Sequence, residues 1–443
     1  MILSKEKCKS ILNRILSQIR FVDESFIRLT GTDQTFLRYA NNMISSASSP
    51  HELKLTITVS VQSREGKSSV TQLDDSSIKK CIKRAVEIAK RAPKNPEYMP
   101  PLCPQKYKKV NAFFKETSTC STENHVSAIK KIIDYAASKQ MKAFGTLSTA
   151  TSFIALASSN GLFAYHIYTE ADCSTTAHTL DGTGSAKNSG SSKSNNSLNP
   201  VKVGEKAVKR ANTVKNPQPL KPGKYTVVLA PEALATLVES TVYFVLNARR
   251  AHQGMTFTSK DGGKTKLGDQ CFGKNITIHS DPFHPDLMDT PFGSSGIPKN
   301  PTKWIEKGII KNLYYSRYWA KKKGVSSSSS YLNILMAGGP HSMDDLIKSV
   351  DYGIYIPRFF YTNVVDPIKL HFTGLTRDGI MLIQKGKLTT PLVNFRFNQN
   401  TATLLNSLTK LSTPRLVTDV WFPALFPAAI AQNFNFTSQA PSI

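Results

Sequence analysis

The sequence contains neither an apolar run long enough to cross a membrane nor a secretory signal. A membrane-spanning helix needs about 20 consecutive apolar residues, and the longest candidate, residues 421–431, is interrupted by Pro423 and Pro427. The first residues, MILSKEKCKS, have lysines after the first apolar positions and no continuous hydrophobic region behind them. We therefore expect a cytoplasmic protein.

The chain also lacks the ligand spacings of common metal sites. Its six cysteines are scattered without a C-x-x-C pair, so we expect free thiols rather than a disulfide framework. Its nine histidines form no H-E-x-x-H or H-x-x-x-H pair, and the closest two, His279 and His284, lie in a proline-rich loop where exposed side chains are expected. No G-x-S-x-G elbow is present. The sequence predicts no metal, no other cofactor and no catalytic residue.

Acidic residues are few relative to basic ones. The chain has 57 lysines and arginines against 31 aspartates and glutamates, a formal net charge of +26. A charge of this size attracts nucleic acids through its long-range field. Between Lys187 and Lys224, however, the nine basic residues are separated by Ser, Asn, Gly and Pro without the aromatics on which single strands stack. We expect a solvated basic surface, and a nucleic-acid-associated accessory protein remains the alternative.

The 443 residues are enough for about two or three domains. Alternating apolar strands and two amphipathic helices predict an N-terminal α/β domain over residues 1–218, a mixed sheet with helices on one face. Within it, residues 182–199 are Gly, Ser, Asn and Lys with almost no apolar content, which predicts a mobile loop. The proline-rich segment NPQPLKPGK marks the boundary, and a strand-rich C-terminal domain is expected over residues 219–443. The predicted fold class is α+β.

A strand followed by a helix organises the second half. The strand ends at Ala230, and Pro231 opens a helix predicted over residues 231–250, because proline suits the first helical turn. Apolar residues at three- and four-residue steps form one stripe along it: Leu234, Leu237, Val238, Thr241, Val242 and Val245. Glu239, Tyr243 and Asn247 fall on a second, more polar face.

This strand–proline–helix unit resembles the TldD/PmbA family, also called the modulator of DNA gyrase family, whose helix carries a metal-binding His-Glu-x-x-x-His pattern. In this sequence the glutamate is Glu239, but Val238 and Tyr243 stand where the pattern has its histidines. Valine has no donor atom and neutral tyrosine is a poor ligand for zinc. Other similar segments extend from about residue 36 to residue 437; among them are Arg38, Ala40, Asn41 and Asn42, where we expect a turn built by asparagine side chains rather than a binding site.

The resemblance is to the TldE/PmbA branch, which lacks the metal motif. It implies a non-catalytic pseudoenzyme that forms a heterodimer with a TldD-like metallopeptidase, or a homodimer, and takes part in processing or degrading peptides. The family's third metal ligand, a cysteine near the C-terminus, is also missing, because no cysteine follows Cys271. We expect Glu239 to pair with an arginine of the same helix or to face water. Alternatively, a cleft that holds peptide would be lined by Glu239, Tyr243, Asn247, Arg249 and Arg250.

Two other functions stay open from the sequence. One is a stand-alone peptidase with an unrecognised metal site, and the other is the nucleic-acid-associated protein suggested by the charge. Metal analysis of the pure protein separates the first from the TldE-like interpretation, and the salt dependence of DNA binding tests the second.

Overall fold

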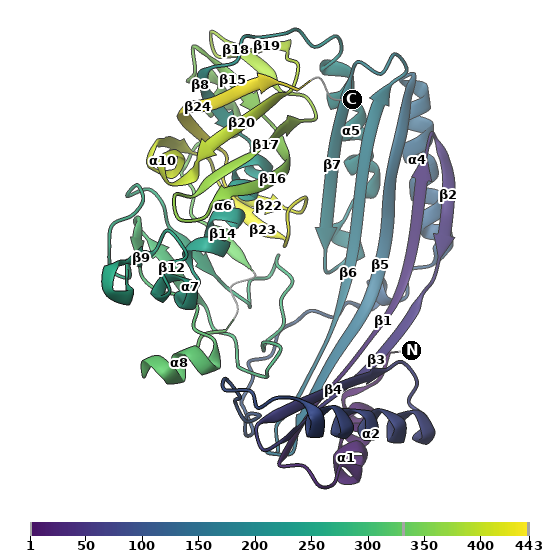
Figure 1. The fold of residues 1–443 in the computed structure, drawn as a ribbon. Coiled ribbons are helices and arrows are strands. Elements are labelled where there is room, and N and C mark those ends of the chain that lie inside the picture. The colour runs from purple at the N-terminus through teal and green to yellow at the C-terminus, as the bar shows by residue number, and fades with distance from the viewer. Residues whose placement is uncertain (1, 330–332, 441–443) are drawn as a thin grey trace.

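The computed structural model describes residues 2–329 and 333–440. The chain forms two halves, one built on a long curved sheet and one on shorter strands, which lie side by side (Figure 1). This arrangement confirms the predicted α+β class. Among the helices of the described residues, none has both the length and the apolar character needed to cross a bilayer.

The N-terminal half is a seven-stranded sheet in the order β4-β3-β1-β5-β6-β7, with β2 paired to β1. Every described strand pair in it is antiparallel, so the predicted mixed sheet is wrong in strand direction. The reason is that β1–β2, β3–β4 and β5–β6 are each joined by a short turn, which reverses the chain. The strands are β1 (Glu24–Ala40), β2 (Met43–Ser48), β3 (His51–Val61), β4 (Arg64–Val70), β5 (Met141–Ser158), β6 (Phe163–Thr179) and β7 (Ser185–Ser192).

The helices cover one face of this sheet, as predicted. Side chains alternate across a strand, and on β1 the odd-numbered residues Ile27 and Leu29 pack with α1 and α2, while Leu37 and Tyr39 pack with α4 and α5. The opposite face is turned toward the C-terminal half (Figure 1). The helices of this half are α1 (Lys5–Gln18), α2 (Asp75–Arg91), α3 (Lys115–Ser118), α4 (Thr122–Ser138) and α5 (Pro200–Thr213).

Residues 182–199 are not the irregular loop that their composition predicts. They contain β7, which pairs with β6, and a short 3-10 turn at Asn195–Ser197. Small polar side chains suit this strand because its Gly190 lies directly against Leu198 and Val203; an added Cβ at Gly190 would approach Leu198 to 2.8 Å. The low strand propensity of these residues is outweighed by packing, because a helix lies close against one face of β7 and the C-terminal half lies against the other.

The asparagine turn between β1 and β2 confirms the structural interpretation of the Arg-x-Ala-Asn-Asn segment. Asn41 and Asn42 both adopt positive φ angles, of 50° and 61°. The side chain of Asn42 donates to the carbonyl oxygen of Met141 at 2.8 Å and accepts from the amide of Ala143 at 2.7 Å. This pair of contacts ties the turn to the start of β5.

The C-terminal half is built on a nine-stranded sheet and a six-stranded sheet. The larger sheet runs β16-β17-β20-β24-β8-β15-β18-β19, with β21 on β24, and the smaller runs β13-β12-β11-β14-β23-β22. Their strands are β8 (Lys224–Leu229), β11 (Ile278–Ser280), β12 (Thr302–Glu306), β13 (Ile309–Ile310), β14 (Ile334–Met336), β15 (Tyr352–Ile356), β16 (Arg358–Asp366), β17 (His371–Arg377), β18 (Met381–Gln384), β19 (Lys387–Pro391), β20 (Phe395–Asn400), β21 (Leu408–Leu411), β22 (Arg415–Val417), β23 (Ala424–Phe426) and β24 (Ala429–Gln439). A third, two-stranded sheet is formed by β9 (Ser259–Lys260) and β10 (Lys264–Thr265).

Among the described residues, five α-helices accompany these sheets, and the longest, α6, lies within their shared core. The predicted single helix over residues 231–250 is two helices, because the chain leaves helical geometry at Asn247, whose extended backbone and side chain cap the second one. The helices are α6 (Pro231–Val245), α7 (Ala248–His252), α8 (Arg317–Lys323), α9 (Met343–Lys348) and α10 (Thr401–Asn406).

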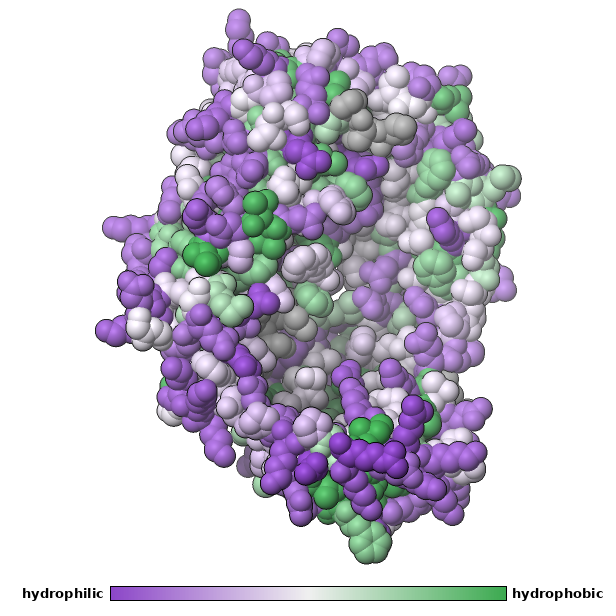
Figure 2. Space-filling model, viewed as in Figure 1, coloured by the Kyte–Doolittle hydropathy of each residue, from purple (hydrophilic) through white to green (hydrophobic). Residues whose placement is uncertain are grey.

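A loop from the C-terminal half anchors the two halves at one end of the sheet. Phe292, 1% exposed, packs with Leu156 of β5 and Ala164 of β6. Nearby, the buried side chains of Lys299 and Asp289 form an ion pair. Between this anchor and the far end of β7 the surface is hollowed, and Figure 2 shows the hollow between the two halves.

Candidate functional site

Helix α6 begins as the sequence predicts. Ala230 directly follows β8, which ends at Leu229. It donates its amide to the carbonyl oxygen of Ile356 at 2.9 Å and occupies the N-cap position before Pro231. The missing N–H of proline costs nothing there, because the first turn of a helix has no internal partner for it. The predicted apolar stripe is buried along its whole length, so α6 is held by packing.

Val238 and Tyr243 point to different environments. Val238 is 1% exposed and belongs to the main hydrophobic cluster of the C-terminal half. Tyr243 is 44% exposed and meets the ring of Trp421 edge-on, with ring centroids 6.3 Å apart. Neither position offers a side chain that binds zinc well. Within residues 2–329 and 333–440, no three His, Cys, Asp or Glu side chains lie close enough together to hold a metal ion.

Glu239 is buried, which corrects the expectation that it faces water or pairs with an arginine of the same helix. It is 7% exposed, and its Oε2 accepts a hydrogen bond from the backbone amide of Trp421 at 3.2 Å. Burial raises the pKa of the Glu239 carboxyl to about 8, against the opposing effect of the backbone amides of Trp421 and Phe422. Its Oε1 is buried and has no hydrogen-bond partner among the described residues.

The two arginines named from the sequence contact other groups. Arg249 forms a bidentate ion pair with Glu97, with both N–O distances 2.7 Å. Arg250 lies over the rings of Tyr243 and Phe244, 5.3 Å and 5.5 Å from their centroids. Asn247 caps α7, and its Oδ1 accepts from the amide of Arg250 at 3.0 Å. Of the five predicted cleft residues, only Tyr243 and Arg250 therefore contact each other through their side chains at an open surface.

The aromatic cluster of Tyr243, Trp421 and Phe422 forms the exposed part of the site. Trp421 is 62% exposed and Phe422 41% exposed, which is unusual for large apolar side chains in neighbouring positions. Both belong to the loop between β22 and β23, whose amides hold the Glu239 carboxylate. In the sequence these residues belong to an apolar run, and the proline that follows the Trp-Phe pair is the signal that could have indicated an exposed loop.

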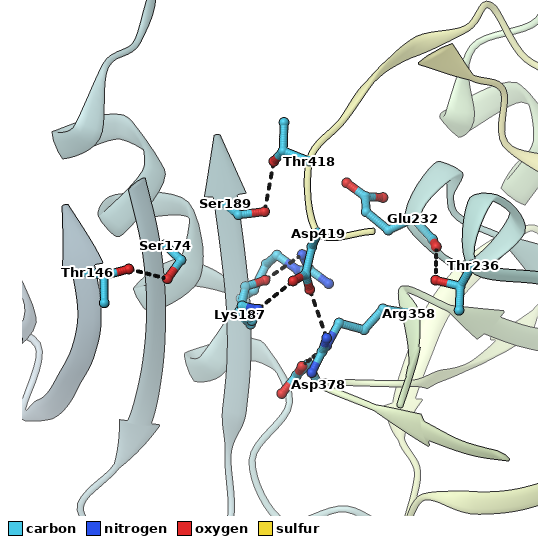
Figure 3. A network of polar contacts seen from close by, with 11 residues as sticks. Thr146, Ser174, Lys187, Ser189, Glu232, Thr236, Arg358, Asp378, Thr418 and Asp419 are labelled. Atoms are coloured by element: carbon cyan, nitrogen blue, oxygen red, sulfur yellow. Dashed lines mark hydrogen bonds and ion pairs between the residues drawn. The ribbon is translucent and has the colours of Figure 1, made fainter. Parts of the chain in front are cut away.

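A polar network attaches the same loop to the N-terminal sheet (Figure 3). Asp419 pairs with Lys187 of β7 at 2.5 Å and with Arg358 of β16 at 2.8 Å, and Arg358 also pairs with Asp378. Thr418 and Ser189 of β7 exchange a hydroxyl hydrogen bond of 3.0 Å. Burial alone would raise the pKa of Asp419, but Arg358 and Lys187 hold it below its ordinary value. Lys187 thus serves an interdomain contact, and Lys193 is 7% exposed, so this basic segment is only partly a solvated surface.

A second group of titratable residues, in which His166 is buried and Glu170 is half-buried, lies on the sheet face turned toward the C-terminal half. Burial and the neighbouring Asp172 raise the pKa of Glu170 to about 8. Burial, together with Lys299 and Lys193, lowers the pKa of His166 to about 4. At neutral pH His166 is neutral and Glu170 is mostly protonated, so this part of the interdomain face carries less charge than its composition suggests.

Fold and site together define a two-part α+β protein in which a strand–proline–helix unit and an aromatic loop meet beside the N-terminal sheet. The chain matches three domains of one family: PmbA/TldA metallopeptidase domain 1 over residues 27–89, the central domain over residues 115–213 and the C-terminal domain over residues 222–438. It belongs to the PmbA/TldD metallopeptidase family.

Solved structures share the fold. TldE from Thermococcus kodakarensis superposes with a TM-score of 0.87 at 20% identity, covering 97% of this chain and 100% of that one. A putative modulator of a DNA gyrase from Thermotoga maritima superposes with a TM-score of 0.84 at 18% identity, again over 97% and 100% of the two chains.

Sequence relatives match only part of the chain. A metalloprotease TldD homolog from Buchnera aphidicola is 35% identical over 112 residues, which is 22% of this chain and 23% of the relative. The chain matches these curated relatives over half of their length or less.

Proposed function

We propose that this chain is a non-catalytic, TldE-like subunit that works in the cytoplasm with a TldD-type metallopeptidase to process or degrade peptides. The domains we assign to it are residues 1–218 and 219–443. In this proposal the partner supplies the metal and the catalytic groups, and this chain shapes the cavity and helps to hold the peptide.

The observation that carries the proposal is the character of α6 at the motif positions. Val238 is a core residue and Tyr243 is an aromatic surface residue, so neither provides the imidazole of a zinc site. Peptide hydrolysis by a metal-bound water needs both the ion and a carboxylate that can accept the proton of the water. With a pKa of about 8, Glu239 is mostly protonated at neutral pH and donates protons more readily than it accepts them.

A role in binding peptide is supported by the exposed side chains of the candidate site. Tyr243, Trp421 and Phe422 present apolar, flat surfaces, and Arg250 stacks on the ring of Tyr243 with its charge near the surface. Aromatic and arginine side chains dominate binding energy at peptide and protein interfaces. The site therefore suits an extended peptide with apolar side chains better than a small polar molecule.

The decisive experiment compares the pure chain, the motif-bearing chain encoded in the same genome, and a mixture of both. We expect cleavage of an unstructured test peptide only when the motif-bearing chain is present, and no stoichiometric zinc in this chain. The control is a pair of matched variants: Glu239→Gln here should leave turnover by the mixture within about twofold, whereas Glu→Gln in the partner's motif should abolish it.

The stand-alone peptidase is the outcome that contradicts the proposal. It would appear as stoichiometric zinc in the pure chain together with cleavage that is lost in its Glu239→Gln variant.

A further inference from the structure

An exposed apolar strip follows the free edge of the C-terminal sheet. Strand β16 ends the larger sheet, and no strand of the described residues pairs with its outer edge. Along β16 and the turn after it, five large apolar side chains are between 40% and 73% exposed: Phe360, Tyr361, Val364, Val365 and Ile368. We call these five residues the β16 strip. Figure 2 shows hydrophobic surface on the visible face in the area where Figure 1 places β16 and β17.

Apart from a bulge, the strip lacks the features by which proteins usually protect an edge strand. Natural edges carry lysine, proline or inward-facing charges that prevent pairing with other chains. Residues 359–365 of β16 contain none of these, and the charged residues stand only at the strand's ends, at Arg358 and Asp366. Large contiguous apolar patches on a soluble protein mark interaction sites.

A bulge in the strand presents one of the aromatic side chains. The register of β16 with β17 shifts between Phe360 and Asn363. At this point Tyr361 adopts a φ of 54° and is 73% exposed. A non-glycine residue held in the left-handed region costs free energy, and such strain concentrates at functional positions. The backbone here places an aromatic ring in solvent instead of in the core.

The strip and the aromatic cluster of the candidate site are joined through the core beneath them. Val364 lies opposite Phe372 in the ladder, and the buried ring of Phe372 lies 6.1 Å from that of Phe244. Phe244 in turn lies 5.1 Å from Tyr243.

The net charge of the chain indicates what kind of partner would bind the strip. The chain carries a net charge of +26, and a net charge far from zero opposes self-association. At the strip itself the guanidinium of Arg377 lies over the ring of Phe360, 4.6 Å from its centroid. An apolar surface beside Arg377 on a protein with a large positive net charge is complementary to an acidic partner and is unfavourable for a second copy.

We propose that the β16 strip is the docking surface for an acidic partner subunit. The proposal rests on the proposed function, because it takes that subunit to be the TldD-type chain. The partner presents an apolar segment to the strip and acidic side chains toward Arg377. Docking there covers the exposed strand edge.

The test is a binding titration between this full-length chain and the motif-bearing chain encoded in the same genome. Val365→Asp should weaken binding by about tenfold or more, because it buries a charge in an apolar interface and repels acidic neighbours. Val365→Lys should weaken binding less, since an acidic partner can pair with the lysine. The matched control is Met43→Asp, which changes an apolar side chain that is 67% exposed on strand β2 of the other half and should leave the affinity unchanged.

Salt and oligomeric state complete the test. Affinity for the wild-type chain should fall as salt is raised, because complementary charge is screened. If the two wild-type chains bind but Val365→Asp binds equally well, the strip proposal fails and the proposed function stands. If the wild-type chains do not bind at all, both fail. A stable homodimer that Val365→Lys disrupts more than Val365→Asp makes a second copy the occupant and overturns the acidic partner.

Discussion

Replacing Glu239 by glutamine should stabilise the protein above neutral pH. The carboxyl has a pKa of about 8 in the folded chain against an ordinary value of 4.5. Because the folded-state pKa is raised, the unfolded chain loses this proton first as pH rises. The free energy of unfolding therefore falls between the unfolded-state and folded-state pKa values and is constant above about pH 8. Glutamine keeps the shape and the acceptor oxygen for the amides of Trp421 and Phe422 but has no proton to lose.

The magnitude follows from the size of the shift. Each pH unit within the window changes the free energy of unfolding by about 1.4 kcal/mol. Between about pH 5.5 and pH 7.5, wild-type stability should therefore drop by about 3 kcal/mol relative to Glu239→Gln. Glu170, whose pKa is also raised to about 8, contributes equally to both proteins, so the difference between them isolates Glu239.

The assay is urea unfolding followed by tryptophan fluorescence at several pH values. The three tryptophans, at positions 304, 319 and 421, all lie in the C-terminal half that contains Glu239, so the signal reports on the relevant half. Parallel pH curves for wild type and Glu239→Gln would refute the assignment of a buried, protonated carboxyl.

Three further predictions test the packing around the site. Arg358→Met leaves Asp378, 5% exposed, without its cation and should cost about 3 kcal/mol, seen as a lower urea midpoint and faster amide exchange in β7. Gly66→Ala should destabilise the N-terminal half by about 2 kcal/mol or more, because the new Cβ would approach the carbonyl oxygen of Ala85 to 1.9 Å; a circular-dichroism melt checks it against Gly182→Ala, where no atom lies within 4 Å and only the left-handed backbone is penalised. Trp421→Ala should remove the acrylamide-quenchable part of the fluorescence and leave the melting temperature nearly unchanged, since Trp421 is 62% exposed while Trp304 and Trp319 are 1% and 6% exposed; an unchanged quenching curve would place Trp421 in the interior.

Periodicity was sufficient to find the apolar side chains that pack together along one element. The apolar stripe of α6 is buried as predicted, and the alternation at Leu55, Ile57 and Val59 marks the buried face of β3. In both cases the side chains that pack are neighbours along one element. Their spacing therefore records the packing surface directly.

Where a segment depends on distant partners, composition was misleading. Residues 185–192 are small and polar, yet they form β7 because β6 offers a free edge and the C-terminal half supplies Asp419 and Thr418. Glu239 was assigned to a polar face, but a loop 182 residues away in sequence covers it. No local pattern encodes such a contact.

Helix α6 keeps its place in the fold through packing. Its buried side chains, from Leu234 to Val245, anchor it in the core of the C-terminal half, and each fully buried aliphatic side chain contributes about 1.5–3 kcal/mol. Val238, at a position where the family's pattern has a histidine, contributes apolar contact to this core. Tyr243 lies at the surface beside Trp421, with ring centroids 6.3 Å apart. The helix is therefore anchored by side chains that are not metal ligands at these two positions.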